Sequence, residues 1–172
     1  MKTLHRLVLA LLVALVAQPA FSASDDVKPE LVARLVTPYV NIQSALAADD
    51  LPAAKSAARE LLSAAAKDPE HKAITDPANA IVSAPDIATA RTSFLKVSQE
   101  LIALVDKVGV AGTPDLFVAH CPMAFSGKGG DWLQTDKKIN NPYYGASMLR
   151  CGSIKREVGA KPAAGGKHNA HH

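Results

Sequence analysis

The sequence predicts a mainly α-helical protein, with an antiparallel bundle of three or four helices followed by a small irregular α+β subdomain. Alanine is abundant and aromatic residues make up only 5% of the 172 residues, which favours helices packed through small side chains over a large β-sandwich. Apolar residues recur at helical spacing through residues 28–109, and this pattern stops near residue 110. We therefore expect one domain over residues 23–158, made of a bundle at 28–109 and a subdomain at 110–158.

The first residues, 1–22, have the features of a secretory signal peptide. Lys2 and Arg6 give a positive start, an unbroken apolar run covers residues 7–17, and small residues surround the expected cleavage site. The apolar run is too short to span a bilayer comfortably, which argues against a permanent membrane anchor. Removing these residues takes away two positive charges, so the formal net charge falls from +3 to 3 − 2 = +1. We expect a nearly neutral periplasmic protein in a compartment that permits disulfides, with no indication of nucleic-acid binding.

Two helices are expected in the first half of the bundle. The first carries apolar residues at steps of three and four from Val32 to Leu46, and Pro38 inside it should kink or split it. The second follows Asp50, a residue type that commonly caps helices, and has Pro52 in its first turn.

The third and clearest helix has an apolar seam over residues 87–108. Ser83 is its expected N-cap, Pro85 its first-turn proline, and Gly109 is placed to end it. Two further patterns typical of helix starts precede this third helix, at Asp68-Pro69 and Asp76-Pro77. We expect them to begin one or two short helices.

The subdomain gathers the sulfur-containing residues. After a strand-like run at residues 116–119, all the cysteines and methionines that remain beyond the signal peptide lie within one 31-residue stretch: Cys121, Met123, Met148 and Cys151. Cys121 and Met123 would share one face of an extended segment, and Met148 and Cys151 would share one face of a helical turn. Thiolate and thioether sulfurs are soft donors that select Cu(I) over magnesium or calcium. His120 precedes the first cysteine and is as compatible with a packed, hydrogen-bonded histidine as with a ligand.

A structural disulfide between Cys121 and Cys151 is the alternative. Two cysteines in an exported protein commonly pair, and closing a loop of about 30 residues stabilises a fold by roughly 3–4 kcal/mol on the chain-entropy model. The methionines would then fill core space, and the aromatic residues between the sulfurs would join the loop to the bundle. The residues leave both alternatives open, and a pair that binds Cu(I) when reduced can form a disulfide when oxidised.

The end of the chain, residues 159–172, reads as a disordered tail that carries His168, His171 and His172. Such histidine-containing ends capture Cu(II), Ni(II) or Zn(II) weakly, or serve only as solubilising tails. Phosphate-binding, nucleophile-elbow and metalloprotease motifs do not occur in the sequence, so we expect no enzymatic activity.

Two motifs together resemble a bacterial exported family, domain of unknown function 3347 (DUF3347). The helical motif is Ala90-Arg91-x-x-Phe94, and the C-terminal string comprises Cys121-Pro122-Met123-Ala124-Phe125, Gly127-Lys128-Gly129, Asp131-Trp132-Leu133, Asn141-Pro142-Tyr143-Tyr144-Gly145 and Met148-Leu149-x-Cys151-Gly152. The resemblance spans roughly residues 28–158, with departures at Gly130-Asp131 and Gln134 that do not touch the sulfurs.

Members of this family often occur beside, or fused to, periplasmic subunits of copper and heavy-metal efflux systems. The resemblance thus implies a metal-linked function, an efflux subunit as partner, and the four sulfur residues as the matching positions. We therefore expect an exported, non-catalytic Cu(I)-binding protein in copper handling or efflux. The alternative is a disulfide-stapled helical interaction module with no metal site.

Overall fold

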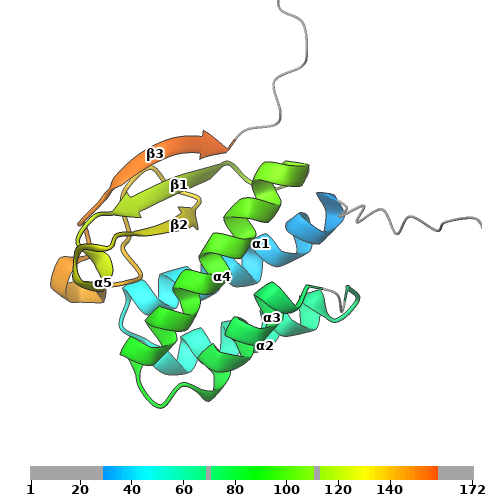
Figure 1. The fold of residues 1–172 in the computed structure, drawn as a ribbon, viewed down its shortest axis with the longest axis horizontal. Coiled ribbons are helices and arrows are strands. Elements are labelled where there is room, and N and C mark those ends of the chain that lie inside the picture. Colours follow the sequence, from blue (N-terminus) through cyan, green and yellow to red (C-terminus); the bar gives the residue numbers. More distant parts are fainter. Residues whose placement is uncertain (1–28, 69–70, 111–112, 159–172) are drawn as a thin grey trace, which may run out of the picture.

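The computed structural model describes residues 29–68, 71–110 and 113–158. Four long helices come first along the chain and a three-stranded antiparallel sheet comes last (Figure 1), which confirms the predicted fold class. The expected signal peptide at 1–22 and the expected tail at 159–172 lie outside the described residues. Within the described ranges, no helix combines the length and apolarity needed to cross a membrane.

The first two helices are α1 (Pro29–Ala47) and α2 (Leu51–Ala65). α1 runs as one element with Pro38 inside it, so the proline does not split the helix. α2 begins as predicted: the Asp50 carboxylate accepts a hydrogen bond from the Ala53 N–H at 2.9 Å, and a proline lies in the first turn. This side chain satisfies one of the N–H groups that a helix start leaves without an intrahelical partner.

The third helix, α3 (Lys72–Ser83), lies in the region where one or two short helices were expected, between α2 and the last helix. Asp76-Pro77 does not start a helix, because Pro77 lies inside α3. A proline there removes one backbone hydrogen bond, and the burial of Ile74, Ala78 and Ile81 on the same helix offsets that loss.

The fourth helix, α4 (Ile87–Val108), ends at Gly109 as predicted, with a glycine φ of 85° at the C-cap. Its predicted N-cap was wrong. Ser83 is the last residue of α3, and the cap is Asp86, whose carboxylate accepts the Thr89 N–H at 2.7 Å. Pro85 therefore precedes the cap instead of lying in the first turn.

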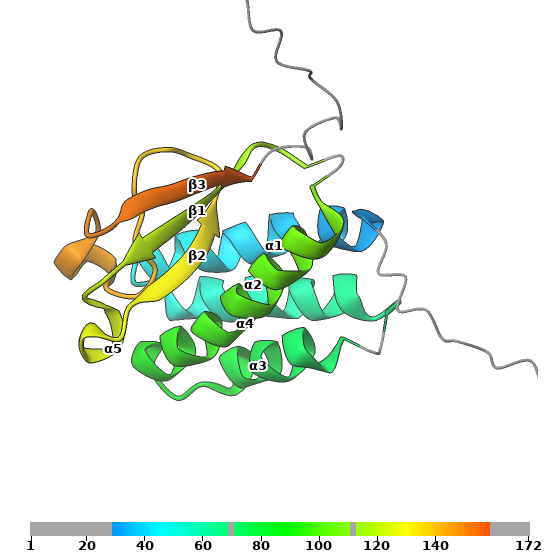
Figure 2. The same ribbon diagram turned by 45° about the horizontal axis from the view of Figure 1, so that its top comes forward.

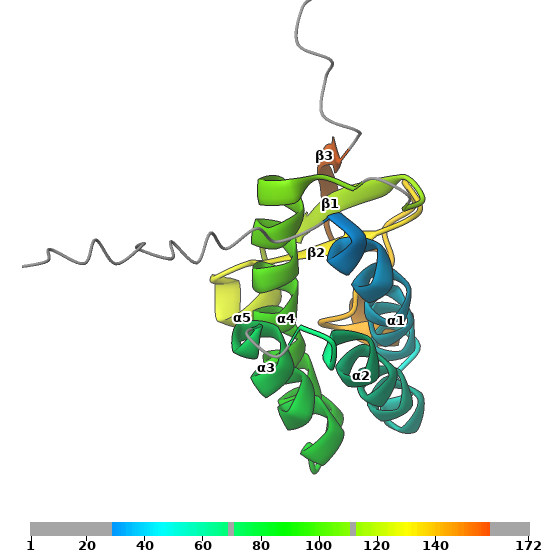
Figure 3. The same ribbon diagram turned by 90° about the vertical axis from the view of Figure 1, so that its right-hand side faces the viewer.

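The sheet comprises β1 (Leu116–Cys121), β2 (Gly130–Gln134) and β3 (Ser153–Val158), in the spatial order β2-β1-β3. A short helix, α5 (Ala124–Gly127), connects β1 to β2, and a 3₁₀ turn, η1 (Gly145–Met148), lies between β2 and β3. The sheet lies over α1 and α4, with α2 and α3 farther from it (Figures 2 and 3). α5 and η1 lie at the same end of the sheet (Figures 1 and 2).

An aromatic cluster joins the bundle to the subdomain. Tyr39 of α1 stacks on Phe94 of α4 with ring centroids 5.1 Å apart, and Phe94 lies 6.1 Å from Tyr143. Tyr143 in turn meets Trp132 of β2 edge-on at 5.6 Å. Such pairs stabilise a core beyond the apolar area they bury. The sequence-based expectation that these aromatic residues join the loop to the bundle is confirmed for Trp132 and Tyr143.

Candidate functional site

The fold brings the two cysteines together. Cys121 ends β1 and is buried, Cys151 follows η1 and is half-buried, and their sulfur atoms are 3.1 Å apart as free thiols. A disulfide requires about 2.05 Å between the sulfurs. A tetrahedral ion with metal–sulfur bonds of about 2.3 Å holds two sulfurs about 3.8 Å apart. Pairing and chelation thus each require a movement of about 1 Å or less, so the geometry is compatible with both.

Backbone contacts fix both cysteines. Cys121 lies opposite Gly130 in the β1–β2 ladder. The Cys151 N–H donates to the Met148 carbonyl at 2.9 Å, which closes the turn that carries both residues. Because both backbones are held, changes in the sulfur separation must come mainly from side-chain rotation.

Asn141 organises this loop, and the sequence analysis did not single it out as a site residue. Its side chain is fully buried, its amide donates to the Cys151 carbonyl at 2.8 Å, and its carbonyl oxygen accepts the Tyr143 N–H at 2.8 Å. Asn141 is the first residue of the Asn-Pro-Tyr-Tyr-Gly turn. This position could have indicated its role from the sequence, since an asparagine side chain commonly bonds the backbone two residues on.

The two methionines near the thiols are exposed. Within the described ranges, Met123 and Met148 are the exposed large hydrophobic residues, at 53% and 37%. The alternative in which they fill core space is therefore wrong. Met123 also does not share a strand face with Cys121, because β1 ends at the cysteine and Met123 lies in the turn that leads into α5. The Tyr144 hydroxyl donates to the Met123 carbonyl at 2.6 Å and so ties the α5 segment to the η1 segment.

His120 has a carboxylate partner. Its Nδ1 lies 2.6 Å from the Asp131 carboxylate, which also receives the Lys155 ammonium at 3.2 Å. Successive side chains on a strand point to opposite faces, so His120 and Cys121 project from different faces of β1. The structure thus places His120 in a hydrogen-bonded cluster with Asp131 and Lys155, on the opposite face of β1 from the Cys121 side chain. The other histidines predicted as weak ligands, His168, His171 and His172, lie outside the described residues.

The thiol pair favours a protonated Cys151. A hydrogen bond with Cys121, followed by burial and by negative charge on the Cys121 sulfur, raises the pKa of the Cys151 thiol above its ordinary value. A bound metal ion requires the thiolate form, so binding must displace this proton. Across the described parts of the chain, no three His, Cys, Asp or Glu side chains gather where they could hold a metal ion. An ion at the thiols that takes more than two protein ligands would therefore need other donors, such as thioethers.

The segment after Met123 has a strained backbone. Phe125 and Ser126 have φ values of 53° and 60°, and Gly127 continues this left-handed turn at 82°. The left-handed region is unfavourable by roughly 1–2 kcal/mol for each residue with a Cβ. The Phe125 ring meets Tyr143 edge-on at 5.0 Å, which helps hold the turn. Backbone strain of this kind clusters at functional sites, and nothing in the local sequence indicated it.

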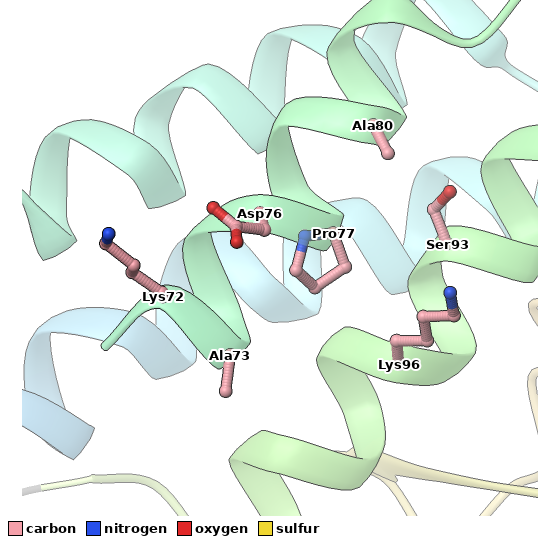
Figure 4. A pocket seen from close by; sticks show the side chains of 7 residues that line it. All are labelled: Lys72, Ala73, Asp76, Pro77, Ala80, Ser93 and Lys96. Atoms are coloured by element: carbon pink, nitrogen blue, oxygen red, sulfur yellow. The ribbon is translucent and has the colours of Figure 1, made fainter. Parts of the chain in front are cut away.

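A cleft of about 390 Å³ lies away from the sulfurs, between α3 and α4. Figure 4 shows Lys72 and Asp76 on α3, with Ser93 and Lys96 on α4. The residues that line it include no cysteine, methionine or histidine. It offers hard oxygen and nitrogen groups instead of soft donors, so it is not an alternative copper site.

The comparisons with known proteins concern the bundle. A family model described as "Protein of unknown function (DUF3347)" matches residues 35–113, less than half of the chain. The match includes the Ala90-Arg91-x-x-Phe94 motif and ends before the sulfur-containing string. It therefore supports the resemblance for the helical part. No curated protein and no solved structure matches the chain.

Proposed function

We propose that this protein is an exported, non-catalytic Cu(I)-binding protein of the periplasm, whose ligands are Cys121, Cys151, Met123 and Met148. The observation that carries the proposal is the thiol pair at 3.1 Å, together with two exposed methionines that lie between the cysteines in the chain, each within three residues of one of them. Thiolate and thioether sulfurs together favour Cu(I) among the common biological metals. Copper efflux, with a periplasmic efflux subunit as partner, is supported by the family resemblance alone.

The exposure of the methionines supports a ligand role. Burying a methionine side chain fully typically contributes about 1.5–3 kcal/mol, and Met123 and Met148 forgo part of this because they are 53% and 37% exposed. Their position is therefore not explained by core packing. A thioether at the surface is, however, accessible to an incoming ion, and both methionines lie on segments that lead directly to or from a cysteine.

The proximity of the thiols also favours a second candidate, a helical interaction module stapled by a Cys121–Cys151 disulfide. The two candidates differ in what the methionines do, because a staple needs no thioether. They also differ in the thiol state, since Cu(I) binding requires reduced sulfur.

The test is anaerobic titration of the reduced protein with Cu(I) against a competing chelator. We expect the double variant Met123→Leu/Met148→Leu to bind Cu(I) at least about tenfold more weakly, equivalent to about 1.4 kcal/mol. Its stability should stay within about 0.5 kcal/mol of the parent, because both side chains are exposed. Lys128→Ala, in the same loop but without sulfur, is the matched control and should bind normally.

Two results would count against the proposal. Unchanged Cu(I) affinity in the double methionine variant would exclude the four-sulfur site. Fully paired thiols in freshly isolated protein, with no Cu(I) binding after reduction, would favour the stapled module.

A further inference from the structure

The thiol pair has the geometry of a two-electron donor. Its sulfurs are 3.1 Å apart, and both cysteine backbones are anchored, one in the β1–β2 ladder and one by Asn141. A disulfide can therefore close within the chain through a side-chain movement of about 1 Å. Cys151 is the half-buried member and Cys121 the buried one, so an oxidant from solution reaches Cys151 first.

We infer that the Cys121–Cys151 dithiol reduces Cu(II), closes into a disulfide, and leaves the Cu(I) product on the thioethers of Met123 and Met148. Two Cu(II) ions each accept one electron, two S–H bonds break, one S–S bond forms and two protons pass to solvent. The reaction is 2 Cu²⁺ + 2 RSH → 2 Cu⁺ + RSSR + 2 H⁺. The assignment of the product to the methionines rests on the proposed function, whereas the reduction itself depends only on the thiols.

Thiols and thioethers have different roles in this reaction because their redox chemistry differs. Thiols can be oxidised to a disulfide by Cu(II), after which they no longer bind metal as thiolates. Thioethers survive this step and prefer Cu(I). The chain has two exposed methionines, each within three residues of a cysteine in the sequence, so one thioether is available for each Cu(I) that the reaction makes.

The contact between the sulfurs suits this role. The two sulfur atoms already lie 3.1 Å apart, so a thiol that gives up an electron has its disulfide partner within reach.

The test uses the full chain with His168→Ala, His171→Ala and His172→Ala, so that the histidine tail does not bind Cu(II). The reduced protein receives two equivalents of Cu(II) without oxygen, in the presence of a chromogenic Cu(I) chelator. We expect two Cu(I) ions per chain, loss of both thiols, and a mass lower by two hydrogen atoms in a monomer. We also expect the reaction to be at least about tenfold faster than in the same chain unfolded in urea, because the fold holds the thiols together.

Variants separate the parts of the inference. Cys121→Ser and Cys151→Ser should each abolish the intramolecular disulfide and leave covalent dimers as the oxidised product. Met123→Leu/Met148→Leu should, without the chelator, lose Cu(I) on gel filtration. The exposed Lys128, which has no sulfur, supplies the control Lys128→Ala, which should reduce Cu(II) at the parental rate.

Intact thiols after Cu(II) addition, disulfides only between chains, or equal rates in the folded and unfolded chain would overturn the reduction. These failures are distinct from that of the proposed function, which is judged by the Cu(I) affinity of the reduced protein. Normal Cu(I) affinity with intact thiols after Cu(II) addition would overturn the reduction and leave the copper-binding proposal standing.

Discussion

The guanidinium of Arg91 meets the carboxylate of Asp49 at 2.6 Å, although 42 residues separate them in the chain. Arg91 also donates to the carbonyls of Pro142 and Leu46, each at 2.9 Å. The second carboxylate oxygen of Asp49 accepts the Ala146 N–H at 2.8 Å. One ion pair thus fastens the α1–α2 junction and α4 to the loop that carries η1.

We call the Asp49–Arg91 ion pair and its hydrogen bonds the Asp49–Arg91 clamp. This clamp explains why the helical motif occurs together with the sulfur-containing C-terminal motif. Within Ala90-Arg91-x-x-Phe94, Arg91 holds the loop before η1, and the Phe94 ring packs 6.1 Å from Tyr143 in the same loop. The motif therefore lies at the interface between bundle and subdomain. It positions the segment that ends in Met148 and Cys151.

Replacing Asp49 with asparagine should lower stability at neutral pH and weaken its dependence on acid. Hydrogen bonds from Ala146 and Arg91 lower the pKa of the Asp49 carboxyl. A lowered pKa stabilises the fold above the unfolded value of about 3.9, and this contribution is lost as pH falls through the folded value. Asparagine tolerates the left-handed backbone at this position, where φ is 59°.

We expect Asp49→Asn to lose about 0.5–1 kcal/mol at pH 7, because the pair is partly exposed. The difference from the parent should shrink as the pH falls below the unfolded value of about 3.9 and through the lowered folded value, because Asp49 then loses its charge. Urea unfolding at several pH values measures this. The exposed residue Asp115 supplies the control variant Asp115→Asn, which should match the parent. A deficit that persists unchanged in acid would contradict the electrostatic explanation.

Gly145→Ala should break the same clamp by crowding. Gly145 has a φ of 60°, and a Cβ there would collide with the Asp49 carboxylate and the Arg91 guanidinium. We expect a loss of about 2 kcal/mol or more, from the left-handed backbone and the displaced ion pair together. Gly127→Ala is the matched control, because its φ is 82° but nothing lies within 4 Å of the added atom. Equal losses in urea unfolding would show that only the backbone matters.

Tyr39→Phe should destabilise the contact between the bundle and the sheet. β2 is an edge strand, and its Leu133 N–H donates to the Tyr39 hydroxyl at 3.0 Å, which in turn lies 2.7 Å from the Ser98 hydroxyl. Burial raises the pKa of Tyr39 well above its ordinary value, so the phenol stays neutral. Removing the hydroxyl leaves a buried N–H without its partner, which costs about 1–3 kcal/mol.

Chemical denaturation of Tyr39→Phe, Ser98→Ala and the double variant measures the coupling. The double variant should lose less than the sum of the two single variants, because both remove the same hydrogen bond. Tyr144→Phe is the control, since its hydroxyl bonds a carbonyl in an exposed loop. Strict additivity would contradict the coupling of Tyr39 and Ser98.

The helices were predictable where their signals are local. Asp50 and Gly109 act within a few residues of the helix ends they define, and both roles are confirmed. The start of α4 was misplaced because Ser83 was taken as its cap, whereas α3 extends to Ser83 and the Asp86 carboxylate caps α4. Pro77 was misread as a helix start because local propensity does not show how much burial the rest of α3 gains.

The site was predictable in composition but not in exposure. The sequence analysis expected Cys121 on an extended segment through Met123 and Cys151 on a helical turn. The structure brings the two cysteines together but ends β1 at Cys121. The surface position of the methionines could not be read from spacing, because spacing fixes neighbours along an element and not what covers them. Asn141 and the Asp49–Arg91 clamp act across the chain, where a single sequence gives no signal.

The two cysteines should differ in their importance for stability. Cys121 has no exposed surface and belongs to the core, whereas Cys151 is half-buried at the edge of the loop. Serine places a hydroxyl where Cys121 has an apolar environment, which costs about 1–3 kcal/mol unless a new partner is found. Cys151→Ser keeps access to solvent and should lose less than about 1 kcal/mol. Urea unfolding with reductant present, so that no disulfide contributes, measures both variants. A larger loss for Cys151→Ser would mean that the hydrogen bond between the sulfurs, and not burial, dominates the energetics of the pair.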